Sequence, residues 1–124
     1  MKSKALIVSI KGTKLSKMEK ILFKKEKPWG VILFKRNLKT FEQIQHLTTT
    51  IKLLTKNKEF PIIIDEEGES VTRLSKILNH KISANFFGEL YKKDKIFCSN
   101  ILKQYTNSLS KILKKLGINI NSIP

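Results

Sequence analysis

Three short apolar runs, separated by amphipathic stretches, constrain the fold of this chain more than any other feature. The runs are Ala5–Val8, Gly30–Phe34 and Ile62–Ile64. All-apolar runs of this length are typical of strands that are buried on both faces of a parallel sheet. The first stretch between them predicts a helix that starts with the capping box of Ser16 and Glu19. The second predicts a helix capped by Thr40. This alternation predicts an α/β fold with right-handed crossovers and a parallel sheet.

The pattern after residue 73 is looser until one long helix becomes clear. Leu74, Ile77 and Leu78 indicate a turn or a short helix, and the segment 83–90 indicates another short helix. From about residue 94 to residue 116, apolar residues recur at helical spacing. Gly117 is the expected C-cap of that helix. A fourth strand is predicted to start at Ile118.

Polar residues gather where the third apolar run ends. Asp65, Glu66, Glu67 and Gly68 follow Ile64 directly, and Arg73 lies a few residues further on. Ligands of parallel α/β sheets bind just beyond the carboxyl ends of the strands. An aspartate and an arginine at one rim would give charge-assisted hydrogen bonds to a hydroxyl-rich ligand. The alternative is that this acidic cluster is only a solvated loop.

The charge of the chain raises a second functional hypothesis. The chain has 124 residues, enough for one domain, and a formal net charge of +15. Such a charge invites nucleic-acid or membrane-surface binding. However, 23 of its 25 basic residues are lysines spread along the chain, and bidentate recognition of bases and phosphates favours arginine. We therefore rank nucleic acid below a small-ligand site. A non-enzymatic basic module that binds anionic polymers remains the alternative function.

The cysteine count and the N-terminus indicate a location. Cys98 is the only cysteine, so no internal disulfide can form, which fits a reducing compartment. The apolar stretch from Ala5 to Ile10 is too short for a signal-peptide core or a membrane span. The cytoplasm is the expected location, with no membrane partner.

Four segments together resemble a known enzyme family. Gly30–Asn37 resembles the "GxILFxRN" segment of family 3 glycoside hydrolases, specifically the bacterial β-N-acetylhexosaminidases. Ile64–Leu74 resembles their "DQEGGRVxRL" segment. Gly12–Leu15 is similar to the "GTxLTxEE" entry to the first helix, and Leu116–Pro124 to "LGVxxNxAPVxD". The segments occur in the family's order and cover nearly the whole chain.

The resemblance implies the first part of a (β/α)8 barrel, with about four strands of the eight that closure needs. Residues 1–124 would then be an incomplete family 3 N-terminal domain. The family cleaves terminal, non-reducing N-acetylglucosamine from β-linked glycans, typically during peptidoglycan recycling, with retention. Its nucleophile is an aspartate late in the barrel, and its acid/base is a His–Asp pair on a mobile loop. These groups lie beyond residue 124, so we expect no activity from this chain alone and a complementing C-terminal polypeptide as a partner. No cofactor or metal is expected.

The resemblance also assigns site residues. Asp65 and Arg73 match the family's sugar-binding aspartate and arginine, and the chain carries no match to a catalytic residue. His46 and His80 do not match the catalytic histidine. Three positions depart from the family pattern, with Glu66 in place of glutamine, Glu69 in place of glycine and Ser70 in place of arginine. We expect Glu66 to add charge beside Asp65. We expect strain at Glu69 if its φ is positive.

Overall fold

The computed structural model describes residues 3–69, 71–79 and 82–123, and its centre is a parallel sheet of four strands. The strands lie in chain order, β1 (Lys4–Ser9), β2 (Pro28–Leu33), β3 (Ile62–Ile64) and β4 (Ile120–Asn121). Each neighbouring pair is parallel. The predicted α/β class and parallel sheet are therefore confirmed. The fourth strand begins two residues later than predicted, at Ile120.

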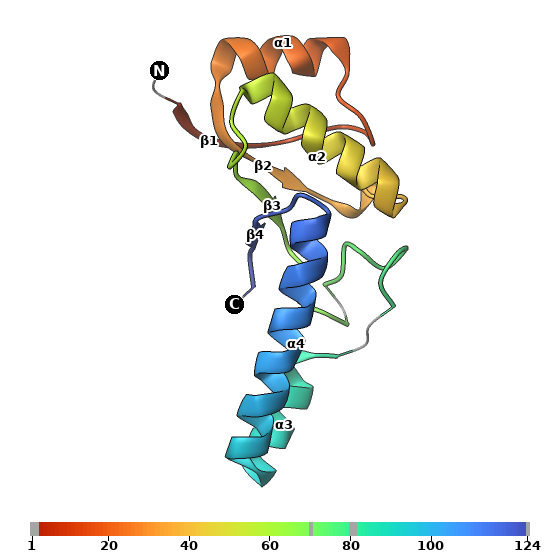
Figure 1. Ribbon diagram of the computed structural model, residues 1–124, viewed down its shortest axis with the longest axis vertical. Coiled ribbons are helices and arrows are strands. Elements are labelled where there is room, and N and C mark those ends of the chain that lie inside the picture. The colour runs from red at the N-terminus through yellow and green to blue at the C-terminus, as the bar shows by residue number, and fades with distance from the viewer. Residues whose placement is uncertain (1–2, 70, 80–81, 124) are drawn as a thin grey trace.

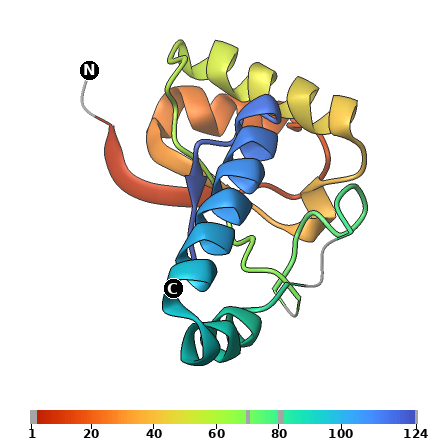
Figure 2. The same ribbon diagram turned by 60° about the horizontal axis from the view of Figure 1, so that its bottom comes forward.

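Helices connect the strands, as the alternation predicts. They are α1 (Lys17–Glu26), the 3₁₀ helix η1 (Lys35–Asn37), α2 (Phe41–Thr55), α3 (Ala84–Lys93) and α4 (Lys95–Lys115). Figure 1 shows α1 and α2 together at one end of the molecule, where they contact each other. Figures 1 and 2 both show α3 beside the N-terminal half of α4, at the end opposite α1. None of the helices in the described residues is both long and apolar enough to cross a membrane.

The helix starts and stops follow local chemistry. The Ser16 hydroxyl accepts a hydrogen bond from the Glu19 N–H, and the Glu19 carboxylate accepts one from the Ser16 N–H, which confirms the capping box. The Thr40 hydroxyl caps α2 by accepting from the Gln43 N–H. The C-cap of α4 is Leu116 and not Gly117 as predicted, and Gly117, with a φ of 79°, is the residue directly after it. This left-handed position lets the chain turn sharply into β4.

The core lies between the sheet and the helices. Val31, Leu33, Ile62 and Ile64 from the central strands are fully buried. They belong to one apolar cluster with residues of α2 and of the C-terminal half of α4: Ile44, Leu47, Ile51, Leu109 and Leu113. Removing apolar surface from water contributes about 25 cal/mol per Å², so this cluster is the main stabilising element of the fold. The carboxyl ends of β2, β3 and β4 are thereby held in fixed positions at one edge.

One expectation about burial is wrong. The sequence predicts that the first strand is buried on both faces, but β1 is an edge strand and pairs with β2 alone among the described strands. Leu6 is 49% exposed and Ile7 is 52% exposed. Ile21 and Leu22 on the apolar face of α1 are exposed as well. An apolar sequence therefore shows what a strand can bury, whereas its neighbours decide what it does bury.

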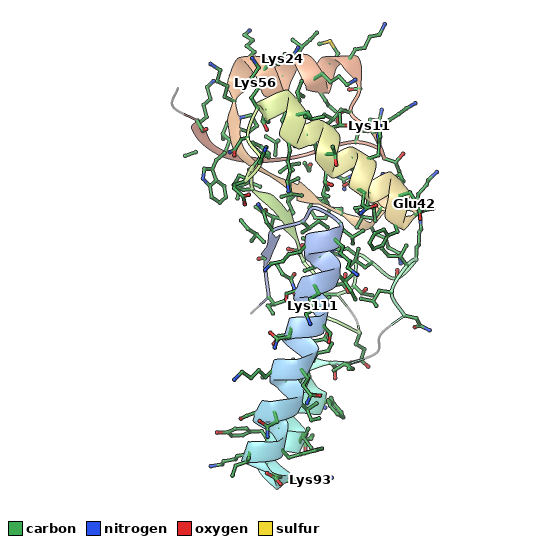
Figure 3. The ribbon with its side chains drawn as sticks, viewed as in Figure 1. Lys11, Lys24, Glu42, Lys56, Lys93 and Lys111 are labelled. Atoms are coloured by element: carbon green, nitrogen blue, oxygen red, sulfur yellow. The ribbon has the colours of Figure 1, made fainter. Side chains whose placement is uncertain are left out.

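The basic residues are dispersed over the surface. Lys24 and Lys56 lie at the end formed by α1 and α2, Lys93 lies at the opposite end, and Lys111 lies between them on α4 (Figure 3). This distribution matches the even spread of lysines along the sequence. The charge of +15 thus belongs to several faces of the molecule.

Candidate functional site

The candidate site lies at the carboxyl end of the sheet, where Asp65 directly follows β3. The Arg73 side chain returns to it, and Arg73 Nη2 lies 3.3 Å from Asp65 Oδ2. The two side chains are 29% and 21% exposed, so the pair faces solvent at a partly sheltered rim. The structure therefore brings together the two residues that sequence analysis selected. Their role in ligand binding remains a prediction.

An aromatic ring forms the other wall beside Arg73. Phe34 directly follows β2, and Arg73 Cζ lies 5.7 Å from the centre of its ring. Arg36 Cζ lies 4.7 Å from the same centre. Guanidinium groups at such distances are attracted to the ring by its quadrupole. Asp65 and Phe34 together hold the Arg73 side chain in one orientation.

Two polar atoms next to this pair are buried without a hydrogen-bond partner among the described residues. They are Arg73 Nε and Thr72 Oγ1. Leaving such a group unsatisfied costs about 1–3 kcal/mol, so buried polar atoms nearly always have a partner. Arg73 Nε and Thr72 Oγ1 are therefore exceptions to this rule among the described residues.

Asn37 fixes the position of Phe34, and sequence reasoning noted it only as part of the family resemblance. Asn37 is fully buried, and its Oδ1 accepts a hydrogen bond from the Phe34 N–H at 2.9 Å. Its Nδ2 donates to the carbonyl oxygens of Ile10 at 3.0 Å and Gly12 at 2.8 Å. This side chain therefore ties the end of β2 to the segment that follows β1. An asparagine in the short loop after a buried strand is the sequence signal for such a role, because its side chain can bond to nearby backbone groups.

The Glu66 carboxylate is buried and bonded to backbone N–H groups, a placement that the sequence did not predict. It is only 1% exposed, and its Oε2 accepts hydrogen bonds from the backbone N–H groups of Arg73 at 2.8 Å and Leu74 at 2.9 Å. Successive side chains of an extended segment point to opposite faces. Glu66 therefore lies on the opposite side of the chain from Asp65. That alternation is the sequence signal for its burial.

The turn between Glu66 and Arg73 contains the strain that the sequence predicts. The Glu67 N–H donates to the Val71 carbonyl, and the Val71 N–H donates to the Gly68 carbonyl, both at 2.9 Å. Gly68 has a φ of 97° and Glu69 has a φ of 35°. The condition under which strain was expected at Glu69, a positive φ, is therefore met. Ser70 lies outside the described residues.

The histidines stand apart from this arrangement. His46 is an exposed residue of α2, and its side chain faces solvent as expected for a surface residue. His80 lies outside the described residues.

A cavity of about 450 Å³ lies between the segment 66–69, α3, α4 and the end of β4, and its lining is mostly apolar. Asp65 and Arg73 are not among its lining residues. Tyr105 of α4 lines it, and burial, followed by the negative charge of Glu66, raises the pKa of Tyr105 above its usual value. The cavity lacks the Asp–Arg pair, so we place the candidate site at the rim and not in the cavity.

In the described part of the chain, the rim offers hydrogen-bonding groups but not the pair of carboxyl groups that cleaves a glycosidic bond. Glycoside hydrolysis uses two carboxyl groups about 5–10 Å apart on opposite sides of the bond. The carboxylate of Glu66 is bonded to backbone N–H groups, whereas Glu67 and Glu69 lie on one tight turn. Hydrogen bonding to hydroxyl groups is the chemistry that remains.

Several known proteins with a similar sequence are named β-hexosaminidases. No protein-family model matches the chain. A β-hexosaminidase from Neisseria gonorrhoeae is 31% identical over 96 residues, which are 77% of this chain and 26% of that protein. The chain spans about a third of the length of other curated β-hexosaminidases that it matches.

Solved structures share the fold. NagZ from Neisseria gonorrhoeae, in complex with N-trifluoroacetyl-D-glucosamine, superposes with a TM-score of 0.89 at 28% identity, over 98% of this chain and 36% of that one. A glycoside hydrolase family 3 β-N-acetylglucosaminidase from Paenibacillus superposes with a TM-score of 0.75 at 25% identity, over 98% of this chain and 23% of that one. In sequence and in fold, the chain corresponds to the N-terminal part of the glycoside hydrolase family 3 β-N-acetylhexosaminidases.

Proposed function

We propose that this chain supplies the sugar-binding rim of a β-N-acetylhexosaminidase, in which Asp65 and Arg73 hold the hydroxyl groups of a terminal N-acetylglucosamine ring. The substrate would be the non-reducing end of a β-linked glycan, as in the peptidoglycan fragments that are recycled in the cytoplasm. One observation carries this proposal. The Arg73 guanidinium lies 3.3 Å from Asp65 at the carboxyl end of the sheet and has a buried Nε without a partner in the described residues.

The physical argument is that the rim is prepared for a neutral, hydroxyl-rich ligand. The charges of Asp65 and Arg73 compensate each other, so this pair by itself attracts neither anions nor cations strongly. Each group still has hydrogen-bonding capacity left, since a carboxylate can accept several bonds and a guanidinium can donate five. That a relative binds N-trifluoroacetyl-D-glucosamine supports the choice of sugar.

The 124-residue chain is expected to bind without cleaving. Asp65 is engaged by Arg73, and Glu66 is engaged by backbone N–H groups. We therefore expect a second polypeptide segment, carrying further strands of the barrel, to supply the nucleophile and the acid. The purified 124-residue chain should not release the chromophore from a chromogenic β-N-acetylglucosaminide. Hydrolysis that is abolished by Glu67→Gln would overturn this assignment of roles.

Nuclear magnetic resonance offers a direct binding test, because the chain has only two arginines. Each gives one Nε–H signal. Arg36 Nε donates to the Ile10 carbonyl at 3.2 Å and serves as an internal reference. Titration with N-acetylglucosamine to millimolar concentrations should move the Arg73 signal and leave the Arg36 signal in place. Glycerol at equal concentration controls for unspecific hydroxyl effects.

Variants make the assignment specific. Asp65→Ala should weaken the response by about tenfold or more, because it removes one partner of a charge-assisted pair. Glu67→Gln changes an exposed carboxylate of the same turn and should leave the response unchanged. An Arg73 signal that does not move, or that moves equally in the Asp65→Ala variant, would remove these residues from a sugar site.

A further inference from the structure

Glu66 is a buried carboxylate that has no role in the proposed contact with the sugar. Its residue exposure is 1%, and its Oε2 accepts from the N–H groups of two consecutive residues, Arg73 at 2.8 Å and Leu74 at 2.9 Å. Bonds to an ionised acceptor are roughly twice as strong as neutral ones. The carboxylate therefore closes the loop that begins at Glu66 and brings the chain back to Arg73.

The backbone of Glu66 is itself held from the neighbouring strand. Asn121, the last residue of β4, accepts the Glu66 N–H at 2.9 Å through Oδ1. Its Nδ2 donates to the Glu66 carbonyl at 3.0 Å. This pair of bonds continues the β3–β4 pairing with a side chain in place of backbone. Glu66 is thus fixed through its backbone by β4, and it fixes Arg73 through its side chain.

These contacts determine where the Arg73 guanidinium can reach. A side chain reaches a target only if its Cα is placed correctly, and the Arg73 N–H is anchored to Glu66. From that anchor the guanidinium meets Asp65 at 3.3 Å and the ring of Phe34 at 5.7 Å. The turn between the two anchors contains Glu69 in a strained backbone conformation with a φ of 35°. Without the Glu66 carboxylate, relief of that strain would favour displacement of Arg73.

We propose that Glu66 is a positioning residue for Arg73, and that Asn121 supports it from β4. The consequence for ligand affinity rests on the proposed sugar-binding function, whereas the effect on Arg73 itself is a property of the chain without ligand. Glu66 does not touch the ligand. It acts by holding the Arg73 backbone so that the guanidinium remains between Asp65 and Phe34.

The test compares three variants of the 124-residue chain. Glu66→Leu removes the acceptor but fills the buried space with a side chain of similar size. Glu66→Gln keeps one acceptor oxygen that can receive both N–H groups. Thr48→Val is the matched control, because it removes a buried hydrogen bond elsewhere, from Thr48 Oγ1 to the Leu116 carbonyl at 2.8 Å.

Two readouts need no ligand. Amide hydrogen exchange at Arg73 and Leu74 should accelerate about 10- to 100-fold in Glu66→Leu, the factor that corresponds to losing a bond to a charged acceptor. Exchange in β2 and α2 should stay unchanged. The Arg73 Nε–H signal should also move toward that of a solvated arginine. In Glu66→Gln, both the exchange rates and the Arg73 signal should stay close to those of the wild type. Thr48→Val should change neither.

Each outcome decides the proposal. An Arg73 signal that does not move in Glu66→Leu would overturn the proposal. So would an Arg73 signal that moves as far in Glu66→Gln as in Glu66→Leu. If Glu66→Leu does not fold, Asn121→Ala decides instead, and an unmoved Arg73 signal in that variant would overturn the proposal. Failure of the sugar-binding function gives a different result. In that case N-acetylglucosamine does not move the Arg73 signal of the wild type, whereas Glu66→Leu still moves that signal in the absence of ligand.

Discussion

Gly117 gives the most stringent test of the described packing, because adding one methyl group there has two separable costs. The residue follows α4 with a φ of 79°, which L-residues with a side chain rarely adopt. A Cβ at this position would lie 2.4 Å from Thr48 Oγ1 and 2.9 Å from Thr48 Cβ. Thr48 cannot yield without losing its hydrogen bond to the buried Leu116 carbonyl.

The magnitude for Gly117→Ala follows from these two terms. Left-handed backbone costs a residue with a Cβ about 1–2 kcal/mol. Displacing the Thr48 hydroxyl adds about 1–3 kcal/mol for the lost partner of a buried group. The sum of about 2–5 kcal/mol is a large part of a typical stability of about 5–15 kcal/mol. With an unfolding entropy of about 2.1 cal/mol/K per residue, the melting temperature should fall by about 8–19 °C.

Thermal and urea unfolding measured by circular dichroism would check this value, with Gly88→Ala as the matched control. Gly88 lies inside α3, and among the described residues a Cβ added there meets no atom within 4 Å beyond its chain neighbours and the backbone of its own helix. The same chemical change should therefore stabilise the protein by about 0.5–1 kcal/mol, since alanine favours a helix over glycine. Two glycine-to-alanine changes in one chain are thus expected to act in opposite directions.

A double-mutant cycle separates the two costs of Gly117→Ala. If the contact with Thr48 contributes, Gly117→Ala combined with Thr48→Ala should lose at least about 1 kcal/mol less than the sum of the single variants. Additive losses would assign the whole effect to backbone strain. A melting temperature of Gly117→Ala within about 2 °C of the wild type would refute the reasoning altogether.

Two further predictions concern the turn and the first helix. Glu69→Gly should stabilise the chain by about 1 kcal/mol in urea unfolding, because it relieves a positive φ of 35°; an unchanged midpoint would contradict the strain. Partial burial acts to raise the pKa of Glu19, but hydrogen bonds from the backbone of Lys11 and Ser16 outweigh it, so its pKa lies below the usual value of 4.5. A depressed pKa stabilises the fold above the unfolded-state pKa and loses this effect as the pH falls through the folded-state pKa. Glu19→Gln should therefore be less stable than the wild type at pH 7, and in urea unfolding this difference should shrink as the pH falls below the ordinary glutamate pKa of about 4.3.

The alternation of elements and the helix caps are accessible from sequence because they depend on neighbours along the chain. The capping box of Ser16 and Glu19 uses residues three positions apart, and Gly117 meets a local demand of the backbone. In each case the groups that interact belong to the same short segment of the chain. For the same reason, the place of Asp65 at a strand end follows from the apolar run that directly precedes it.

The tertiary structure decided which side chains are buried and which groups they contact. The apolar residues Leu6 and Ile7 fit a buried strand, yet β1 lies at the edge of the four described strands and leaves them half exposed. The sequence shows that Glu66 adds a carboxylate next to Asp65, but only the structure shows that this carboxylate is buried against the backbone N–H groups of Arg73 and Leu74.

The sequence by itself determined which segments become strands and helices, and which polar residues stand at strand ends. Only the tertiary structure decided how they meet. The pairing of Arg73 with Asp65, the ring of Phe34 beside it and the support from Asn121 join residues of three strand ends. The physical reason is that a side chain's environment in a sheet is made mostly by segments distant in sequence, and local periodicity contains no information about which segments those will be.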